Sequence, residues 1–299
     1  MNIAIIGYGS IGQRHEKNCL SLGHSVDVLS RHVGRKLKKG NYDLVVICSK
    51  TSEHLSNVKR FNLLSQNFLI EKPLAATYKD ALAIKKILAG KKVRVGYCLI
   101  FNPIIKKIKQ IIDESNLGNI FFAQLYAGSY LPNWRKGEDY RKRYSAKRDE
   151  GGGVALDLIH EINYAQYLFP DKLNSVYSYL AKISNLEITS DDLAHFALIQ
   201  TDRLITITLN YFQLFPERYI RIIGSQGTLF ADLVDKRIEV YDQDNKPRYK
   251  RQFDFDYNQM YIDEIKSMER FIKGSEPQAD ILSIDQAIGD LRVVEGKPL

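Results

Sequence analysis

Cysteine is scarce in this sequence and is not arranged for cross-linking. The 299 residues include three cysteines, Cys19, Cys48 and Cys98, an odd number without any C-x-x-C pair. All three lie among apolar residues, which argues against both a disulfide framework and a cysteine zinc site. We therefore expect no bound metal. Free cysteines suit a reducing compartment, so we expect the protein in the cytoplasm.

Long hydrophobic runs are also missing. No apolar run reaches the roughly 18 residues that a membrane-spanning helix needs. The first residues, Met1–Gly7, have no basic segment and no small-residue cleavage site, and they read directly as a strand. We expect neither a membrane partner nor a signal peptide.

Acidic residues are depleted in the first part of the chain. The net charge is +8, but residues 1–120 hold 20 Lys and Arg against 8 Asp and Glu, whereas residues 121–299 hold 23 against 27. A basic first half suits a phosphate-rich ligand. Most of these charges fall on the outer faces of expected helices, which favours a solvated surface. No nucleic-acid-binding motif accompanies them, so we expect no nucleic acid partner.

The first 120 residues alternate between apolar strands and amphipathic helices. Strands are predicted at residues 3–6, 26–29, 44–48, 68–70 and 93–95, and the short apolar runs are typical of buried parallel strands. Thr77 and Asp80 resemble a capping box at the start of one helix, and Pro103 suits the first turn of another. This alternation predicts an α/β Rossmann domain over residues 1–118.

Beyond Gly118 the pattern changes. A strand at 120–127 precedes a polar loop at 128–150, and a helix is predicted from Gly153 to about Phe169. Further strands follow, among them 204–212 and a hairpin of 218–223 with 228–233, before helices near 261–273 and 284–295. We expect residues 119–299 to form an α+β domain with a large, mostly antiparallel open sheet for substrate binding and oligomerisation. Its terminal helix is expected to pack back on the first domain.

A glycine-rich loop joins the first strand to the first helix. Gly7, Gly9 and Gly12 form a G-x-G-x-x-G motif in the strand–turn–helix context that dinucleotide binding requires. The glycines permit a tight turn, close approach of a pyrophosphate and close helix packing. We predict that these glycines, with Ser10 and Ile11 at the helix N-terminus, bind the cofactor phosphates.

No acidic residue stands at the end of the second strand, where an Asp or Glu would bind the ribose of NAD. Ser30 and Arg31 occupy that place, 18 and 19 residues after Gly12, with Arg35 and Lys36 nearby. A cation there suits the 2′-phosphate of NADP, so we predict NADP as the preferred cofactor and NAD as the alternative. The other interpretation is that Arg31 points to solvent.

Several further motifs together resemble the Gfo/Idh/MocA family of NAD(P)-dependent oxidoreductases, over nearly the whole chain. They are the glycine loop, residues 46–51 with His54, Glu71-Lys72-Pro73, residues 95–97 with Asn102-Pro103, the segment from Gly151 to His160, and the hairpin turn at 222–228. The Glu-Lys-Pro after a fourth strand and the Gly-Gly…Asp…His segment are specific in combination.

The resemblance implies roles for particular residues. Lys72 would stabilise charge on the reacting oxygen, and His160, with Asp157, would accept the hydroxyl proton. It further implies a cis peptide between Lys72 and Pro73. Cofactor contacts would also come from Ser49, His54, Glu71 and Lys72, and substrate contacts from Tyr97 and Asn102.

The sequence departs from the family's common pattern in four ways. Asp157 and His160 are three residues apart where four intervening residues are usual, which leaves open which of them is the main base. Lys50 replaces a frequent proline, Ile100 a common arginine, and Asn163 a frequent aspartate.

An aromatic, basic loop precedes the three consecutive glycines. Trp134, Tyr140, Arg141 and Tyr144 lie in it and could stack on a sugar or bind its anionic groups. We predict substrate binding for these four residues, in a pattern that resembles family members acting on surface sugars. A solvated loop or a contact with a partner subunit remains the alternative.

Together these features predict a sugar dehydrogenase or reductase that works as a homo-dimer or homo-tetramer through its C-terminal sheet. The substrate would be a sugar hydroxyl or keto carbon, possibly of a nucleotide-activated or amino sugar in surface-polysaccharide metabolism. Two alternatives stay open: a regulatory protein that senses NADP and sugar without turnover, and a redox-neutral enzyme with a tightly bound cofactor.

Overall fold

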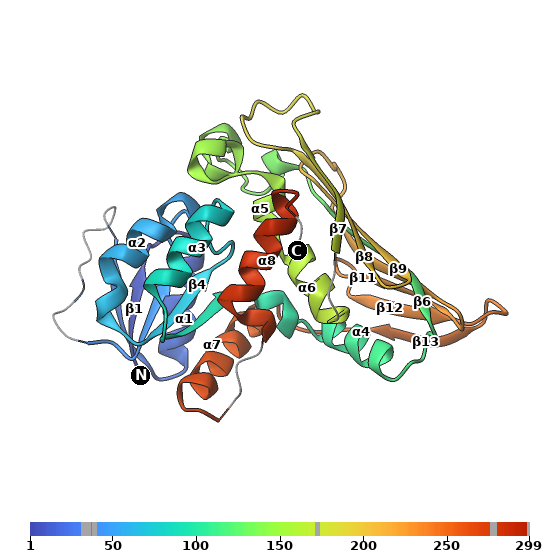
Figure 1. Ribbon diagram of the computed structural model, residues 1–299, viewed down its shortest axis with the longest axis horizontal. Coiled ribbons are helices and arrows are strands. Elements are labelled where there is room, and N and C mark those ends of the chain that lie inside the picture. The colour runs from blue at the N-terminus through green and yellow to red at the C-terminus, as the bar shows by residue number, and fades with distance from the viewer. Residues whose placement is uncertain (31–36, 38–40, 171–173, 276–279, 298–299) are drawn as a thin grey trace. The chain divides into compact units, whose positions relative to one another are not determined.

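The computed structural model describes the chain except for residues 31–36, 38–40, 171–173, 276–279 and 298–299. The described chain divides into two compact units, which are treated separately below (Figure 1). The first unit comprises residues 1–98, 149–151 and 257–289, and the second comprises residues 99–148, 152–256 and 290–299. No helix among the described residues is both long enough and apolar enough to cross a membrane.

The first unit is built on a five-stranded parallel sheet in the order β2-β1-β3-β4-β5. Its strands are β1 (Asn2–Ile6), β2 (Ser25–Leu29), β3 (Leu44–Ile47), β4 (Asn67–Glu71) and β5 (Lys92–Gly96). Between them run α1 (Ser10–Ser21), α2 (His54–Phe61) and α3 (Tyr78–Ile87). All five predicted strands are present, because each apolar run is short, β-rich and bounded by turn residues.

A helix from the far end of the sequence completes the core of this unit. Helix α7 (Asn258–Ile272) contacts α1 and β5. Its buried residues Ile265, Met268 and Phe271 pack in one cluster with Ile3 and Leu44 of the sheet. The helix places a narrow apolar stripe against the sheet.

The second unit contains an eight-stranded sheet in the order β13-β12-β11-β10-β6-β9-β8-β7. Its strands are β6 (Ile120–Gly128), β7 (Asn174–Ala181), β8 (Leu193–Gln200), β9 (Arg203–Asn210), β10 (Glu217–Gly224), β11 (Thr228–Asp232), β12 (Arg237–Tyr241) and β13 (Pro247–Gln252). Among the described strands of this sheet, only β6 and β9 pair in parallel, and the other neighbours are antiparallel. The predicted hairpin of β10 and β11 is confirmed.

Helices cover one face of this sheet. They are α4 (Pro103–Asp113), α5 (Val154–Asp157) and α6 (His160–Leu168), and α8 (Ile284–Val294) runs from the first unit into the second. Helix α6 contacts β6 and β9, where the alternating residues Leu125 and Ile207 are fully buried. Tyr126 and Thr208 on the other face are only partly buried.

The expected fold class, a Rossmann domain plus a mostly antiparallel sheet domain, is therefore confirmed. Thr77 caps α3 as predicted, since its side chain accepts a hydrogen bond of 3.1 Å from the Asp80 amide. One prediction was wrong in detail. The single helix expected from Gly153 is two helices, interrupted by a turn at Leu158 and Ile159.

Candidate active site

The glycine loop is tightly packed at two glycines and open at the third. A side-chain carbon on Gly7 would lie 2.6 Å from the Ser49 amide nitrogen, and one on Gly12 would lie 2.3 Å from the Gly7 carbonyl oxygen. Nothing lies within 4 Å of the same position on Gly9. Helix α1 begins at the next residue, Ser10, so the positive end of the helix dipole lies next to the space beside Gly9. This arrangement fits the pyrophosphate of a dinucleotide.

The end of β2 holds the predicted ribose-binding residues only in part. Ser30 follows β2 directly and is 7% exposed. Arg31, Arg35 and Lys36 lie outside the described residues. The structure therefore does not test the prediction of a 2′-phosphate site.

His54 ties together two loops at the carboxyl edge of the parallel sheet. The ring is buried, with Nε2 3.1 Å from the carbonyl oxygen of Ser49 and Nδ1 3.2 Å from that of Leu74. Burial lowers the pKa of His54, which favours a neutral ring. The Ser49 hydroxyl accepts a hydrogen bond of 2.8 Å from Asn57. Ser49 and His54 thus fix the backbone around the predicted cofactor site.

The Glu-Lys-Pro motif lies where β4 ends. Glu71 is the last residue of the strand, and its carboxylate lies 2.6 Å from Nε2 of buried His15 in α1. Lys72 is the first residue beyond the strand and is partly exposed. The Lys72–Pro73 peptide is cis, as predicted. Lys72 thus stands at the strand edge where ligands bind in open parallel sheets.

Two of the predicted substrate contacts are deeply buried. Tyr97, in the first unit, is 0% exposed. Asn102, in the second unit, is 1% exposed, and its Oδ1 accepts a 2.8 Å hydrogen bond from the Ile104 amide at the start of α4. This capping bond, with Pro103 in the first turn, explains an asparagine at this position. Substrate contact by either residue stays a prediction.

The consecutive glycines admit no side chain in the second unit. A side-chain carbon on Gly152 would lie 1.9 Å from the Tyr144 carbonyl oxygen, and one on Gly153 would lie 2.3 Å from the Asp191 carboxylate. That carboxylate accepts a 3.0 Å hydrogen bond from the Ala155 amide at the start of α5. Gly152 and Gly153 thus let the 140s loop and Asp191 close on the short helix that carries Asp157.

Asp157 is held by two phenols. The Tyr211 hydroxyl donates to Oδ2 of Asp157 at 2.5 Å, and the Tyr144 side chain also hydrogen-bonds to this carboxylate. The charge of Asp157 and burial raise the pKa of Tyr144, and burial with the same charge raises that of Tyr211. Both phenols therefore remain donors, and they orient a buried carboxylate three residues before His160, the first residue of α6.

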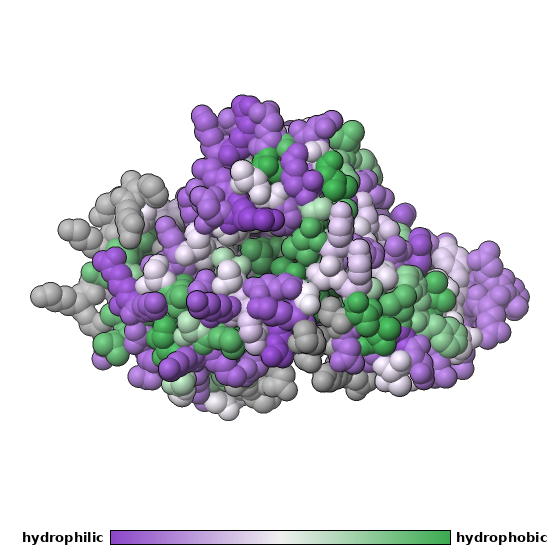
Figure 2. Space-filling model, turned by 45° about the horizontal axis from the view of Figure 1, so that its top comes forward, coloured by the Kyte–Doolittle hydropathy of each residue, from purple (hydrophilic) through white to green (hydrophobic). Residues whose placement is uncertain are grey.

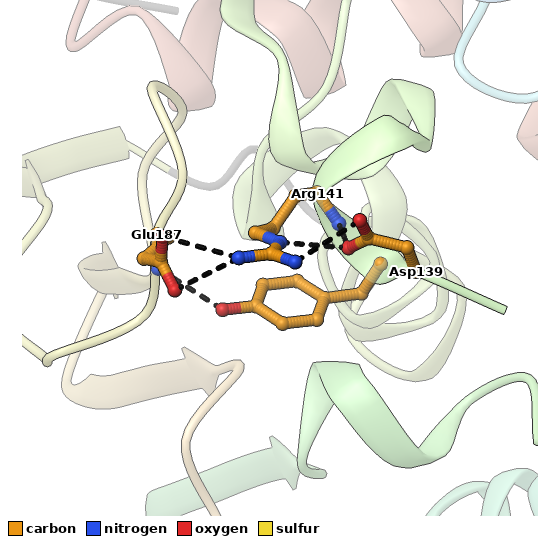
Figure 3. Close-up of polar contacts among 4 residues, drawn as sticks. Asp139, Arg141 and Glu187 are labelled. Carbon is orange, nitrogen blue, oxygen red and sulfur yellow. Dashed lines mark hydrogen bonds and ion pairs between the residues drawn. The ribbon is translucent and has the colours of Figure 1, made fainter.

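Tyr140 and Arg141 hold the aromatic, basic loop to the segment before β8 (Figure 3). The Arg141 guanidinium lies between Asp139, with Nε at 2.8 Å, and Glu187, with Nη1 at 3.3 Å. The Tyr140 hydroxyl accepts a 3.1 Å hydrogen bond from the Glu187 amide. In this structure both predicted substrate residues connect two loops, and a substrate anion would compete with two carboxylates for Arg141.

The same loop encloses a cavity of about 80 Å³. Trp134 and Tyr144 line it, with Arg135 and Arg143 among the other residues. Trp134 is anchored by a 2.8 Å hydrogen bond from Nε1 to the Ser129 hydroxyl and packs edge-on against Tyr211, with ring centroids 5.2 Å apart. The end of the molecule that carries these loops, at the top of Figure 1, shows mainly hydrophilic side chains with a few apolar ones among them (Figure 2).

Two of the four departures acquire partners in the structure. Lys50 forms a 2.6 Å ion pair with Glu150, both in the first unit. Asn163 donates a 3.4 Å hydrogen bond to the fully buried carboxylate of Asp290. Ile100 is simply buried, at 7% exposure.

Sequence reasoning missed three residues of this region: Tyr211, His15 and Glu264. The alternation of the strand predicted at 204–212 places Tyr211 on its apolar face, but strand periodicity cannot identify the hydrogen-bond partner of its hydroxyl. Glu264 lies in α7, almost 200 residues after Glu71, and the pattern of that helix shows only that the position faces inward. No pattern in the local sequence could have shown that Glu71 and Glu264 lie close together.

A five-stranded parallel sheet with an open glycine at its first helix is the architecture of a dinucleotide-binding domain. Family models agree. Residues 26–98 match the NAD-binding Rossmann fold of the GFO/IDH/MocA oxidoreductase family, and residues 105–230 match the GFO/IDH/MocA C-terminal domain. The chain belongs to the GFO/IDH/MocA family of oxidoreductases, an enzyme family with an NAD-binding domain.

Relatives of known name agree with this assignment. The chain is 24% identical to myo-inositol 2-dehydrogenase of Thermotoga maritima, over 93% of this chain and 90% of that protein. Its fold is similar to levoglucosan dehydrogenase in complex with NADH, with a TM-score of 0.81 and 14% identity over 99% and 95% of the two chains. It is also similar to the WlbA dehydrogenase of Bordetella pertussis in complex with NADH and UDP-GlcNAcA, with a TM-score of 0.76 and 17% identity over 100% and 98%.

Proposed function

We propose that this protein catalyses reversible hydride transfer between a sugar carbon, as hydroxyl or ketone, and a nicotinamide cofactor. The observation that carries the proposal is the buried Asp157, oriented by Tyr144 and Tyr211, three residues before His160. A buried carboxylate held by fixed donors and followed closely in the sequence by a histidine offers titratable groups of the kind that proton-transfer sites use. A regulatory protein that senses NADP and sugar without turnover would not need a proton acceptor oriented in this way.

The cofactor, when bound, supplies the carbon that accepts or donates hydride. Gly7, Gly9, Gly12, Ser10 and Ile11 would hold its phosphates, with Ser49, His54 and Glu71 supporting the adjacent edge. Lys72 would donate a hydrogen bond to the reacting oxygen and stabilise its negative charge. His160 would accept the hydroxyl proton, and Asp157 would orient or share that task.

A panel of sugars tests the proposal. Free polyols, free sugars and nucleotide-linked amino sugars are mixed with the enzyme and NAD or NADP, and the absorbance of the reduced nicotinamide is followed. We expect turnover with one class, abolished or lowered by roughly 10²–10³-fold in Lys72→Ala and His160→Ala. Lys79→Ala, an exposed lysine in the first turn of α3, is the matched control. Full activity in both active-site variants would refute the mechanism.

We propose a nucleotide-linked or amino sugar as the substrate class. Aromatic rings and two arginines line the small cavity of the 130s–140s loop, a combination that suits sugar stacking and anion binding. The similarity to a dehydrogenase bound to UDP-GlcNAcA supports the same class. A thermal-shift screen of nucleotide sugars with cofactor present tests it, because a ligand that binds the native state raises Tm.

We further propose that NADP is preferred over NAD. The support is Arg31 in place of the usual acidic residue, whereas the solved relatives described above hold NADH. Arg31→Asp should shift the ratio of kcat/KM values toward NAD, since a carboxylate accepts from the ribose 2′-hydroxyl and repels a phosphate. A wild-type preference for NAD would refute this part alone.

A homo-dimer or homo-tetramer formed through the large sheet is also proposed. The sheet face opposite α6 exposes apolar and aromatic side chains: Tyr177, Tyr179, Ile199, Leu204 and Ile223 are 38–52% exposed, and Tyr126 stacks on Tyr219 at 5.0 Å. Ile199 and Leu204 are cross-strand partners on β8 and β9, so the apolar surface is continuous there. Such surfaces are usually covered by a partner.

A further inference from the structure

Three buried ionisable side chains meet below the edge of the parallel sheet. His15 comes from α1, Glu71 from the end of β4 and Glu264 from α7, all within the first unit. Their exposures are 0%, 7% and 2%, and one nitrogen or oxygen atom of each lies within 4.8 Å of those of the other two. Glu71 directly precedes Lys72.

Two of the three side chains are hydrogen-bonded to each other, and the third is not hydrogen-bonded within the described part of the chain. Glu71 lies 2.6 Å from His15, but neither oxygen of Glu264 has a hydrogen-bond partner among the described residues. The Glu71 carboxylate also lies flat against Gly96, where a side-chain carbon would be 3.1 Å from it. An ionised carboxylate without a donor in a buried site is strongly disfavoured. Glu264 therefore needs either a cation or a proton.

The groups facing Glu264 come from every element around it. They are His15 of α1, Cys48 after β3, Glu71 of β4, Arg94 of β5 and Cys98 after β5. Arg94 is the fixed cation, but its Nη1 donates to the Ser267 hydroxyl at 2.5 Å and its guanidinium lies over the Phe271 ring at 4.5 Å. Burial and the charge of Glu71 raise the pKa of Glu264, and Arg94 opposes them.

A proton fits this site better than a metal ion. Two protein ligands bound at ~2.0–2.2 Å to one tetrahedral ion lie roughly 3 Å or more apart. The His15–Glu71 separation of 2.6 Å is instead that of a charge-assisted hydrogen bond. A proton placed on Glu264 would convert it into a donor for the nearby Glu71 carboxylate.

We propose that Glu264 is held as a neutral acid that shares its proton with Glu71, and that this buried pair, with His15, positions the strand end that carries Lys72. Glu264 and His15 are then positioning residues. The link to turnover rests on the proposed function, whereas the acid pair itself does not.

Glu264→Gln tests the acid pair, because glutamine is always neutral and its amide can still donate to Glu71. We expect the infrared band of a protonated carboxyl group in wild type at neutral pH, and its loss in this variant. A folded-state pKa raised above the unfolded value means that the native state loses stability as pH rises through that interval. The Tm margin of Glu264→Gln over wild type should therefore widen as pH rises above the ordinary pKa of a glutamate carboxyl, about 4.3.

Asp263→Asn, at the neighbouring and partly exposed position, is the control for replacing a carboxyl group of α7 by an amide, and it should keep the infrared band of wild type. Three results would overturn the acid pair. One is a Tm margin of Glu264→Gln over wild type that does not change with pH, and another is an infrared spectrum that the substitution leaves unchanged. The third is a stoichiometric divalent metal in purified wild type that is lost in Glu264→Gln.

Amide hydrogen exchange of residues 71–75 in the full chain tests the positioning. Glu264→Leu should accelerate exchange there by several-fold, and Glu264→Gln should restore the wild-type rate. Equal rates in all three proteins would overturn the positioning role. Hydrogen exchange needs no substrate, so its result can be interpreted even if the proposed sugar chemistry is wrong. The kcat of Glu264→Leu measures the catalytic consequence separately.

Discussion

At the scale of single residues, the glycine loop contains one glycine with open space around it and two that are tightly packed. Gly9 has extended backbone angles and open space around it, whereas Gly12 touches the Gly7 carbonyl. The same kind of substitution therefore has different effects at positions three residues apart.

Gly9→Val should fold with nearly wild-type stability but lose dinucleotide binding, because its side chain fills the space for the pyrophosphate. Gly12→Ala should instead lower the free energy of unfolding, by about 1–3 kcal/mol, since the added carbon overpacks the loop. Calorimetric titration with reduced cofactor and urea denaturation measure the two effects. Unchanged affinity in folded Gly9→Val would show that the loop does not bind the cofactor.

The hydroxyl oxygen of Tyr211 is a single atom whose removal should affect both stability and activity. Tyr211→Phe removes a donor to the buried Asp157 carboxylate, so we expect a loss of about 1.5–3 kcal/mol in stability and a lower kcat with unchanged cofactor affinity. Urea unfolding and steady-state kinetics provide the measurements. Tyr179→Phe, on the exposed face of β7, is the control. Wild-type stability and kcat in Tyr211→Phe would contradict a role in orienting Asp157.

At the scale of elements, caps explain where helices begin. Thr77 and Asn102 each accept a backbone amide at the first turn of α3 and α4. The turn at Leu158 and Ile159 shows the opposite case, because no glycine or proline marks it. That short interruption separates Asp157 from His160 and was not readable from residue spacing.

Thr77→Ala should destabilise the protein by about 0.5–2 kcal/mol, because it removes a hydrogen bond to an otherwise unsatisfied amide. Cofactor affinity should not change. Thermal unfolding checks the first statement and titration the second. Thr77→Ser, which keeps the hydroxyl, should behave as wild type; equal losses in both variants would exclude the capping bond as the cause.

At the scale of the whole molecule, the proposed assembly through the exposed apolar face of the large sheet can be tested by placing a charge on that face. Leu204→Glu should shift the protein to a smaller species in light scattering coupled to gel filtration, because a charge on that face would lose its hydration on association. Leu63→Glu, on a leucine that is 85% exposed in the first unit, is the control. A wild-type monomer at all concentrations would refute assembly through this sheet.

Much of the fold could be predicted from the sequence because its strands and helices follow from the local periodicity of apolar residues. The five buried parallel strands, the alternation of β9 and the hairpin of β10 and β11 depend on side chains that alternate or cluster within a few residues. The glycine loop was equally readable, since its chemistry depends on neighbouring backbone.

The contacts that shape the site were decided by tertiary structure alone. Tyr211 meets Asp157 across 54 residues, His15 meets Glu71 across 56, and Glu264 arrives from α7 near the end of the chain. Periodicity shows that such positions are buried but not which groups they meet, because the partner depends on how strands and helices are ordered in space. The sequence determined the elements and the cofactor loop, and the packing of distant elements decided which buried charges are shared, capped or paired.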